Sequence, residues 1–165
     1  MATPTALPAA FVAGDVLLAE QLNDVRGAFR VLQVVTGTTT TSTSSSTATM
    51  ADTTLTATIT PSDSSSNVLV FANHPGCKKA AGNVNNALLL KLFRGATQLA
   101  FNNSIGADGT TAELIFSTSF VYLDSPATTS ATTYKTQFSN AVVAASVSVQ
   151  LASTPSNIIL MEISA

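Results

Sequence analysis

The stretch LTATITPSDSSSNVLVFAN, Leu55 to Asn73, decides the fold class of this 165-residue chain. At its start apolar residues alternate with threonines, which is typical of a strand with one buried and one solvated face. Pro61 to Asn67 then gathers the Ser, Asp and Pro residues of a turn. Val68 to Ala72 is a continuous apolar run that suits a central strand. The stretch therefore predicts two strands joined by a turn.

The same succession of apolar runs and turn residues continues to the end of the chain. Arg94 and Gly95 indicate a hairpin turn, and Asp124 to Thr132 forms another turn region. Further strands are predicted at Leu88 to Leu92, Leu99 to Phe101, Leu114 to Leu123, Tyr134 to Phe138, Val143 to Leu151 and Asn157 to Ile163. Because no helical pattern separates them, we predict a mostly β fold: a single antiparallel β-sandwich of about eight strands, jelly-roll-like or immunoglobulin-like.

One helical pattern precedes this sandwich, from Phe11 to Val35. Asp15 follows Gly14 and is placed to accept the unpaired backbone N–H groups of a first helical turn. Apolar residues then recur at spacings of four, three, four and three, which is a narrow coiled-coil seam rather than a broad face. The members of this seam are Leu18, Leu22, Val25, Phe29 and Leu32.

A seam of this length needs a partner, because isolated helices this short barely hold in water. It can pack on the sheet of its own chain, or it can meet copies of itself around a symmetry axis. We favour the second arrangement, since the stripe is narrow and the opposite side carries charged residues such as Glu20, Asp24 and Arg26. The five seam residues are thus the predicted oligomerisation site.

The chain divides into three predicted parts. Residues 1–35 form an N-terminal arm and the oligomerisation or docking helix, and residues 51–165 form the β-sandwich domain. Between them residues 36–50 consist almost entirely of Ser and Thr, which is common in linkers. Because threonine also favours strands, this segment is predicted as a linker or an edge strand.

The composition excludes several classes of function. Only 10% of the residues are charged and the net charge is −2, so no nucleic-acid partner is expected. No apolar run reaches the roughly 20 residues of a membrane-spanning helix, so membrane insertion is not expected either. Cys77 is the only cysteine, which rules out an intrachain disulfide.

No catalytic or metal site is predicted, and no cofactor is expected. Asp63, Asp108 and Asp124 all lie in predicted turns, where aspartate commonly caps the local backbone. His74 is the only histidine, so one chain can assemble neither a His-rich metal site nor two catalytic histidines. We therefore expect a protein that is not an enzyme.

Four segments suggest a family. FVAGDVLLAEQLNDVRGAF, from Phe11 to Phe29, resembles a short motif near the N-terminus of many tailed-bacteriophage virion proteins. The stretch from Leu55 to Asn73 resembles a turn and strand common in the C-terminal domains of the same proteins. FVYLDSPATTSATTYKTQF and NIILMEISA, which begin at Phe120 and Asn157, are similar to their closing strands.

This resemblance implies a structural protein of the virion, assembled in the cytoplasm of the bacterial host. It implies a homotrimer whose N-terminal helix lies on the three-fold axis and whose sandwiches splay outward, as in a short tail fibre or minor tail protein. Its partners would be other tail or capsid proteins. Two alternatives remain open: a capsid decoration (cement) protein, and a free-standing carbohydrate-binding sandwich with its helix packed on its own sheet.

An appendage of this kind can also adhere to the host surface. Function on sandwich folds concentrates in loops, and the predicted loops 73–82 and 102–109 are rich in Asn and Gly. Their amide groups can hydrogen-bond a cell-surface glycan. The candidate contact residues are Asn73, His74, Asn83, Asn85, Asn102, Asn103 and Asp108.

Overall fold

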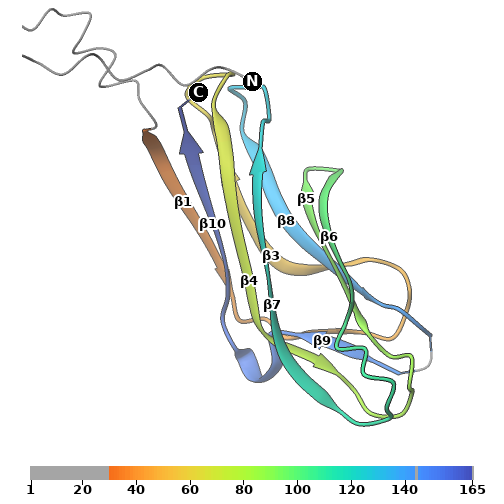
Figure 1. The fold of residues 1–165 in the computed structure, drawn as a ribbon. Coiled ribbons are helices and arrows are strands. Elements are labelled where there is room, and N and C mark those ends of the chain that lie inside the picture. Colours follow the sequence, from red (N-terminus) through yellow and green to blue (C-terminus); the bar gives the residue numbers. More distant parts are fainter. Residues whose placement is uncertain (1–29, 144, 165) are drawn as a thin grey trace, which may run out of the picture.

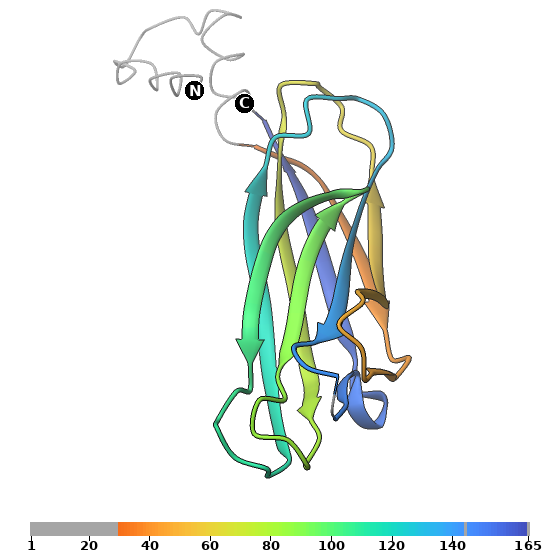
Figure 2. The ribbon, with the colours of Figure 1, turned by 90° about the vertical axis from the view of Figure 1, so that its right-hand side faces the viewer.

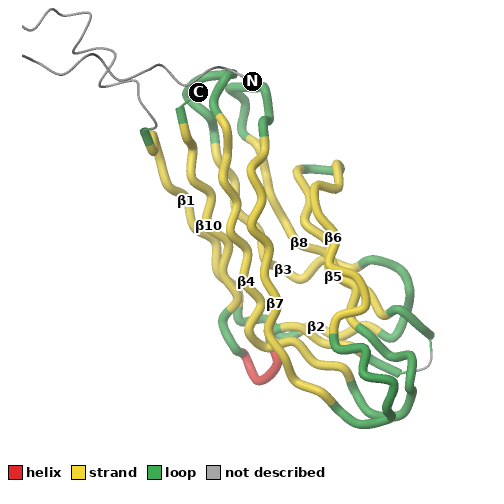
Figure 3. The backbone as a smooth tube through the Cα atoms, in the orientation of Figure 1, coloured by secondary structure: helices red, strands yellow, loops and turns green. Residues whose placement is uncertain are grey.

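The computed structural model describes residues 30–143 and 145–164. The predicted seam residues Leu18, Leu22, Val25 and Phe29 lie outside this part of the chain. Almost all of the described regular structure is strand, and a short 3-10 helix, η1, precedes the last strand (Figure 3). The elements are β1 (Val31–Thr39), β2 (Thr43–Ser45), β3 (Ala51–Ile59), β4 (Asn67–Lys79), β5 (Leu88–Arg94), β6 (Thr97–Ile105), β7 (Leu114–Asp124), β8 (Thr132–Asn140), β9 (Val147–Val149), η1 (Leu151–Ser153) and β10 (Ser156–Ile163).

The strands form two antiparallel sheets that pack face to face (Figures 1 and 2). The larger sheet has the order β1-β10-β4-β9-β2, with β7 as a further partner of β4. Within β4 the first part pairs with β10 and the last two residues pair with β9, while β7 pairs with β4 along nearly its whole length. The smaller sheet has the order β3-β8-β5-β6. The prediction of a mostly β, antiparallel fold is confirmed.

The core lies between the sheets and is built from every second residue of the facing strands. In β3 the apolar residues of the alternating pattern are buried and the threonines between them are exposed. In β4 the inward residues Val68, Val70 and Ala72 are fully buried. The smaller sheet contributes, among others, Leu88, Leu90, Leu92, Tyr134 and Phe138. The alternation read from the sequence thus identifies the inward face of each sheet.

The prediction that the helix extends to Val35 is wrong. Val31 to Val35 belong to β1, so Leu32 lies in a strand and not in a helical seam. The strand continues through Thr39 and pairs with β10 from Ile163 back to Ser156. This segment is rich in β-branched residues, and a partner strand more than a hundred positions away in the sequence satisfies its backbone. Of the Ser/Thr-rich segment, Thr43–Ser45 forms β2.

Polar side chains connect the two sheets along both sides of the sandwich. On one side the Gln33 side chain donates to the Thr60 carbonyl at 2.7 Å, and Thr39 and Thr54 share a hydrogen bond of 2.7 Å. On the other side Asn102 of β6 donates to Thr118 Oγ1 of β7 at 3.1 Å. These hydrogen bonds join the two sheets at both edges of the sandwich.

The long sandwich has two distinct ends. At one end Arg30, just before β1, pairs with Ser164, just after β10, through two backbone-donated bonds of 3.0 Å. At the opposite end lie the loops that follow β4 and β6 (Figure 1). There Gly82 N donates to the Thr111 carbonyl at 3.0 Å, so these two loops lie together.

Candidate assembly surface

The outer face of the larger sheet carries apolar side chains in registered rows. Strand pairing places the outward residues of β1, β10, β4 and β7 side by side, because residues in register point to the same face. The first row is Val34, Met161, Leu69 and Leu123, and the second is Thr36, Ile159, Phe71 and Val121. Between these rows and the Arg30 end of the sandwich, Val31 pairs with Ile163.

Much of this surface is open to solvent. Val121 is 67% exposed, Leu123 57% and Val34 53%, whereas the inward residues of β7 beside them are buried, as at Phe120, or partly buried, as at Tyr122. Val31 and Phe71 are also exposed. Single exposed apolar residues are ordinary, but a contiguous patch across four strands usually marks an interaction surface.

The energy available from covering this face is moderate. Completing the burial of a half-exposed side chain contributes about 1 kcal/mol, so the five most exposed residues give about 5 kcal/mol for one face. Two such faces packed together therefore give about 10 kcal/mol, which is close to the cost of association of about 4–15 kcal/mol. The face suits an interface that another contact reinforces.

Polar residues bound this patch on the side away from Arg30. The next row across the same strands is Thr38, Asn157, Asn73 and Ser119. The apolar rows themselves carry no charged residue. An apolar centre with a neutral polar margin is the arrangement found in protein–protein interfaces.

The outer face of the smaller sheet is different. In β3 it presents the exposed threonines Thr54, Thr56 and Thr58. Lys135 pairs with Asp52 at 3.0 Å, and the Lys91 ammonium lies 4.9 Å from the centre of the Phe101 ring. These hydroxyl and charged groups interact with one another and can hydrogen-bond to water, so this face suits contact with solvent. The two sides of the sandwich are thus chemically distinct.

His74 is not a surface contact residue, contrary to prediction. It lies within β4, which runs without a break through the predicted loop start, and its side chain is fully buried. Nε2 lies 3.1 Å from Thr136 Oγ1, and Nδ1 lies 3.1 Å from the Gln150 side-chain amide. With the Gln150 amide oxygen facing Nδ1, the imidazole donates from Nδ1 and accepts at Nε2. Burial lowers the pKa of His74 to about 4, so the ring is neutral at pH 7.

The other predicted contact residues do not form one site. Asn73 is exposed in the polar row of the larger sheet, and Asn103 is exposed on β6 rather than in a loop. Asn102 also lies in β6, where its side chain is engaged with Thr118. Only Asn83, Asn85 and Asp108 lie in the loops at the far end.

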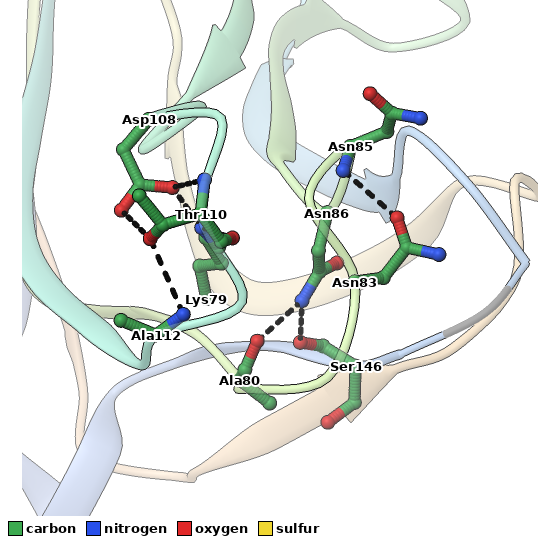
Figure 4. Close-up of polar contacts among 9 residues, drawn as sticks. All are labelled: Lys79, Ala80, Asn83, Asn85, Asn86, Asp108, Thr110, Ala112 and Ser146. Carbon is green, nitrogen blue, oxygen red and sulfur yellow. Dashed lines mark hydrogen bonds and ion pairs between the residues drawn. The ribbon is translucent and has the colours of Figure 1, made fainter.

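Those far-end loops are held from within (Figure 4). The buried Lys79 ammonium forms an ion pair with Asp108 and donates to the Thr110 carbonyl at 2.9 Å, which fixes the loop after β6. Hydrogen bonds from Lys79 and Thr110 hold the pKa of Asp108 well below its ordinary value. Asn83 Oδ1 accepts from the Asn85 backbone at 2.8 Å. These side chains support the loop backbones, and among residues 30–143 and 145–164 no ligand-binding set gathers around them.

Further acidic residues are also engaged in the fold. Asp124 accepts two 2.8 Å bonds from Arg94 and one of 2.6 Å from the Tyr134 hydroxyl, which joins β5, β7 and β8. Glu162 is buried; burial favours its neutral form, but hydrogen bonds from Gln33 and Ser62 outweigh this and lower its pKa to about 2.

Two further features of the described residues bear on chemistry. Burial raises the pKa of the Cys77 thiol to about 12, so it is not poised as a nucleophile. Within residues 30–143 and 145–164 no three His, Cys, Asp or Glu side chains lie close enough together to hold a metal ion. In the same part of the chain, no helix has the length and apolar character needed to cross a membrane.

Comparisons with known proteins add little. No protein-family model matches the chain, and no curated protein matches its sequence. Among solved structures, a match is the crystal structure of the infectious bursal disease virus VP2 subviral particle, at 12% identity and a TM-score of 0.42. The match covers 81% of this chain and 40% of that chain. At this identity and overlap the likeness carries no argument about function.

The residues of the assembly surface were not among those predicted from the sequence. A signal for them was present: strands apolar on both faces indicate that both faces become buried. The run from Val68 to Ala72 was interpreted as a central strand of one sandwich. That strand, β4, is indeed central in the larger sheet, but on its outward face Phe71 is exposed and Leu69 is only partly buried by the described part of the chain.

Proposed function

We propose that this chain is a non-enzymatic structural component of a tailed-phage virion, a homotrimeric surface appendage of the short tail-fibre or minor tail class. The observation that carries the proposal is the contrast between the two outer faces of the sandwich: one carries uncharged apolar rows near the Arg30 end, and the other is threonine-rich and charged. A protein that works alone in solution has no need of such an uncovered face. The resemblance of Phe11–Phe29 to virion proteins supplies the particle class.

The arrangement of the two ends favours an appendage over a capsid decoration protein. The N-terminal segment, with its predicted seam, joins the body at Arg30 beside Ser164, while the loops after β4 and β6 lie at the opposite end. A body attached through its N-terminal end presents those loops away from the particle. Host adhesion through them is part of the proposed role.

Self-association is tested with a variant of the predicted seam. Leu22→Ser combined with Phe29→Ser removes two large apolar side chains, each of which contributes on the order of 1 kcal/mol if half buried between copies. Sedimentation equilibrium of the full chain should give a trimer mass for the wild type and a lower mass for the variant. Glu20→Ser with Asp24→Ser, on the opposite side of the pattern, serves as the control. A monomeric wild type would contradict the proposal.

The location on the particle is tested by copy number. Purified virions are separated on a stained gel, and the band of this chain is compared with that of the major capsid protein. A tail appendage gives a few copies per particle, in multiples of three for a trimer. A number that matches the capsid lattice would replace the appendage with a decoration protein.

A further inference from the structure

We propose that the apolar outer face of the larger sheet packs against the same face of other copies of this chain, so that the bodies meet around the axis instead of splaying apart. The inference rests on the proposed self-association of the N-terminal segment and adds to it the surface that the bodies share. The face is defined by the rows of Val34 and Thr36 across β1, β10, β4 and β7.

A single residue separates the predicted seam from the first strand of the sandwich. Phe29, a predicted seam residue, is followed by Arg30, and β1 begins at Val31. One intervening residue spans only about 3.5 Å. If the predicted seam brings copies of the N-terminal segment together, the start of each β1 is brought close to the axis as well. The bodies therefore meet at that corner whatever their orientation.

At that corner the bodies present apolar residues. Arg30 is pinned to Ser164, so β1 and β10 start and end beside the axis. The apolar rows begin there with Val31 and Ile163, and the polar row of Asn73 lies farther along the strands. The apolar part of the sheet is thus the part nearest to the proposed self-association of the N-terminal segment.

The charge distribution also allows identical faces to meet. The rows carry no charged residue, so identical faces meet without like-charge repulsion. The charged outer face of the smaller sheet then points away from the axis. The energy from covering the apolar face is comparable with the cost of association, so the face alone binds weakly. Attachment to the associating N-terminal segment raises the local concentration of bodies and makes such a weak contact effective.

The test is a pair of substitutions on the face, Val34→Asp with Val121→Asp, in the full chain. Both side chains are more than half exposed in the single chain, so folding is expected to survive, and circular dichroism checks it. Analytical ultracentrifugation should show that the concentration at half dissociation rises roughly 100-fold, about tenfold for each buried charge. The control is Val143→Asp, a loop valine that is 73% exposed at the other end of the body.

A cross-link gives a second readout that does not depend on loss of binding. In the Phe71→Cys variant, mild oxidation should yield disulfide-linked pairs of chains on a non-reducing gel, while Val143→Cys should not. The native Cys77 is fully buried, so the wild type should remain unlinked.

The possible failures are distinguishable. If the wild type is oligomeric but the Asp variant keeps its full mass and Phe71→Cys does not cross-link, the inference is overturned and the proposed function stands. The face would then be covered by the chain's own N-terminal segment or by another virion protein. If the wild type is a monomer, the proposed self-association itself fails.

Discussion

At the scale of the residue, His74 links strands that lie far apart in the sequence. Its ring lies between Thr136 of β8 and Gln150, and Thr136 in turn shares a 2.6 Å hydrogen bond with Thr53 of β3. A buried polar chain of this kind is stable only while every member is satisfied. A second proton on the imidazole would remove the acceptor that Thr136 needs and would bury an unpaired charge.

The protein should therefore lose stability in mild acid. The folded pKa of His74 is about 4 against an ordinary value of 6.5, so the unfolded chain binds the proton first as the pH falls. As the pH falls from 6.5 to 4, the free energy of unfolding should decrease by at most about 3.4 kcal/mol, and below pH 4 this group should cause no further decrease.

Urea denaturation across this pH range measures the effect. His74→Gln keeps one donor and one acceptor but does not titrate, so the slope above pH 4.5 should vanish in that variant. The carboxylates with lowered pKa values, such as Glu162, begin to lose their contribution only below their ordinary value of about 4.5. An equal slope in wild type and variant would contradict the assignment to His74.

At the scale of the element, β1 shows why the sequence predicted some strands and not others. The alternation of apolar residues and threonines at Leu55 to Ile59 is compatible only with a strand, because a period of two residues does not fit a helix. Val31 to Val35 fits a helical spacing as well, and its strand state depends on pairing with β10 at the other end of the chain. No local pattern reports such a distant partner, so the predicted helix ran too far.

The residues of the assembly surface also depend on contacts between strands that are distant in the sequence. The apolar runs in β4, β7 and β10 could be read from the sequence, but which residues share an outer face depends on strand order and register. The predicted contact residues failed for a related reason. Asn73 and Asn102 resemble turn residues locally, whereas Pro75 and Gly76 are accommodated inside β4 at a register shift opposite β7.

Close approach of β1 to β3 gives a test at this scale. A Cβ atom on Gly37 would overlap the Thr56 carbonyl oxygen and lie 3.1 Å from Ile158 Cγ2, and neither the backbone nor the buried side chain can easily yield. Gly37→Ala should lower the free energy of unfolding by about 3 kcal/mol. Urea denaturation checks it, with the exposed neighbour Thr38→Ala expected to change it by about 0.5 kcal/mol or less. A neutral Gly37→Ala would mean that the two strands can move apart.

At the scale of the whole molecule, the two sides and the two ends of the sandwich have separate tasks. In the proposed assembly the larger sheet faces other copies, the smaller sheet faces solvent, and the Arg30 end faces the particle. The far-end loops, braced by the ion pair of Lys79 and Asp108, are then the outermost part. This orientation is a property of the assembled virion and can be measured there.

Chemical labelling of intact virions should report the orientation. Particles carrying Val143→Cys, a loop residue that is 73% exposed, should react readily with a membrane-impermeant maleimide. Particles carrying Arg30→Cys should react slowly until they are dissociated, because that end lies against the attachment site. Mass spectrometry of the labelled chain quantifies both. Equal reactivity of both positions in intact particles would argue against a projecting body.

The pairing of Arg30 with Ser164 at one end has a mechanical consequence. A pulling force between the attachment end and the distant loops acts along the strands, whereas the hydrogen bonds between antiparallel strands are perpendicular to the strands. Such a load strains many bonds in a ladder at once instead of opening them one after another. A sandwich anchored in this way is suited to bearing traction between a particle and a cell.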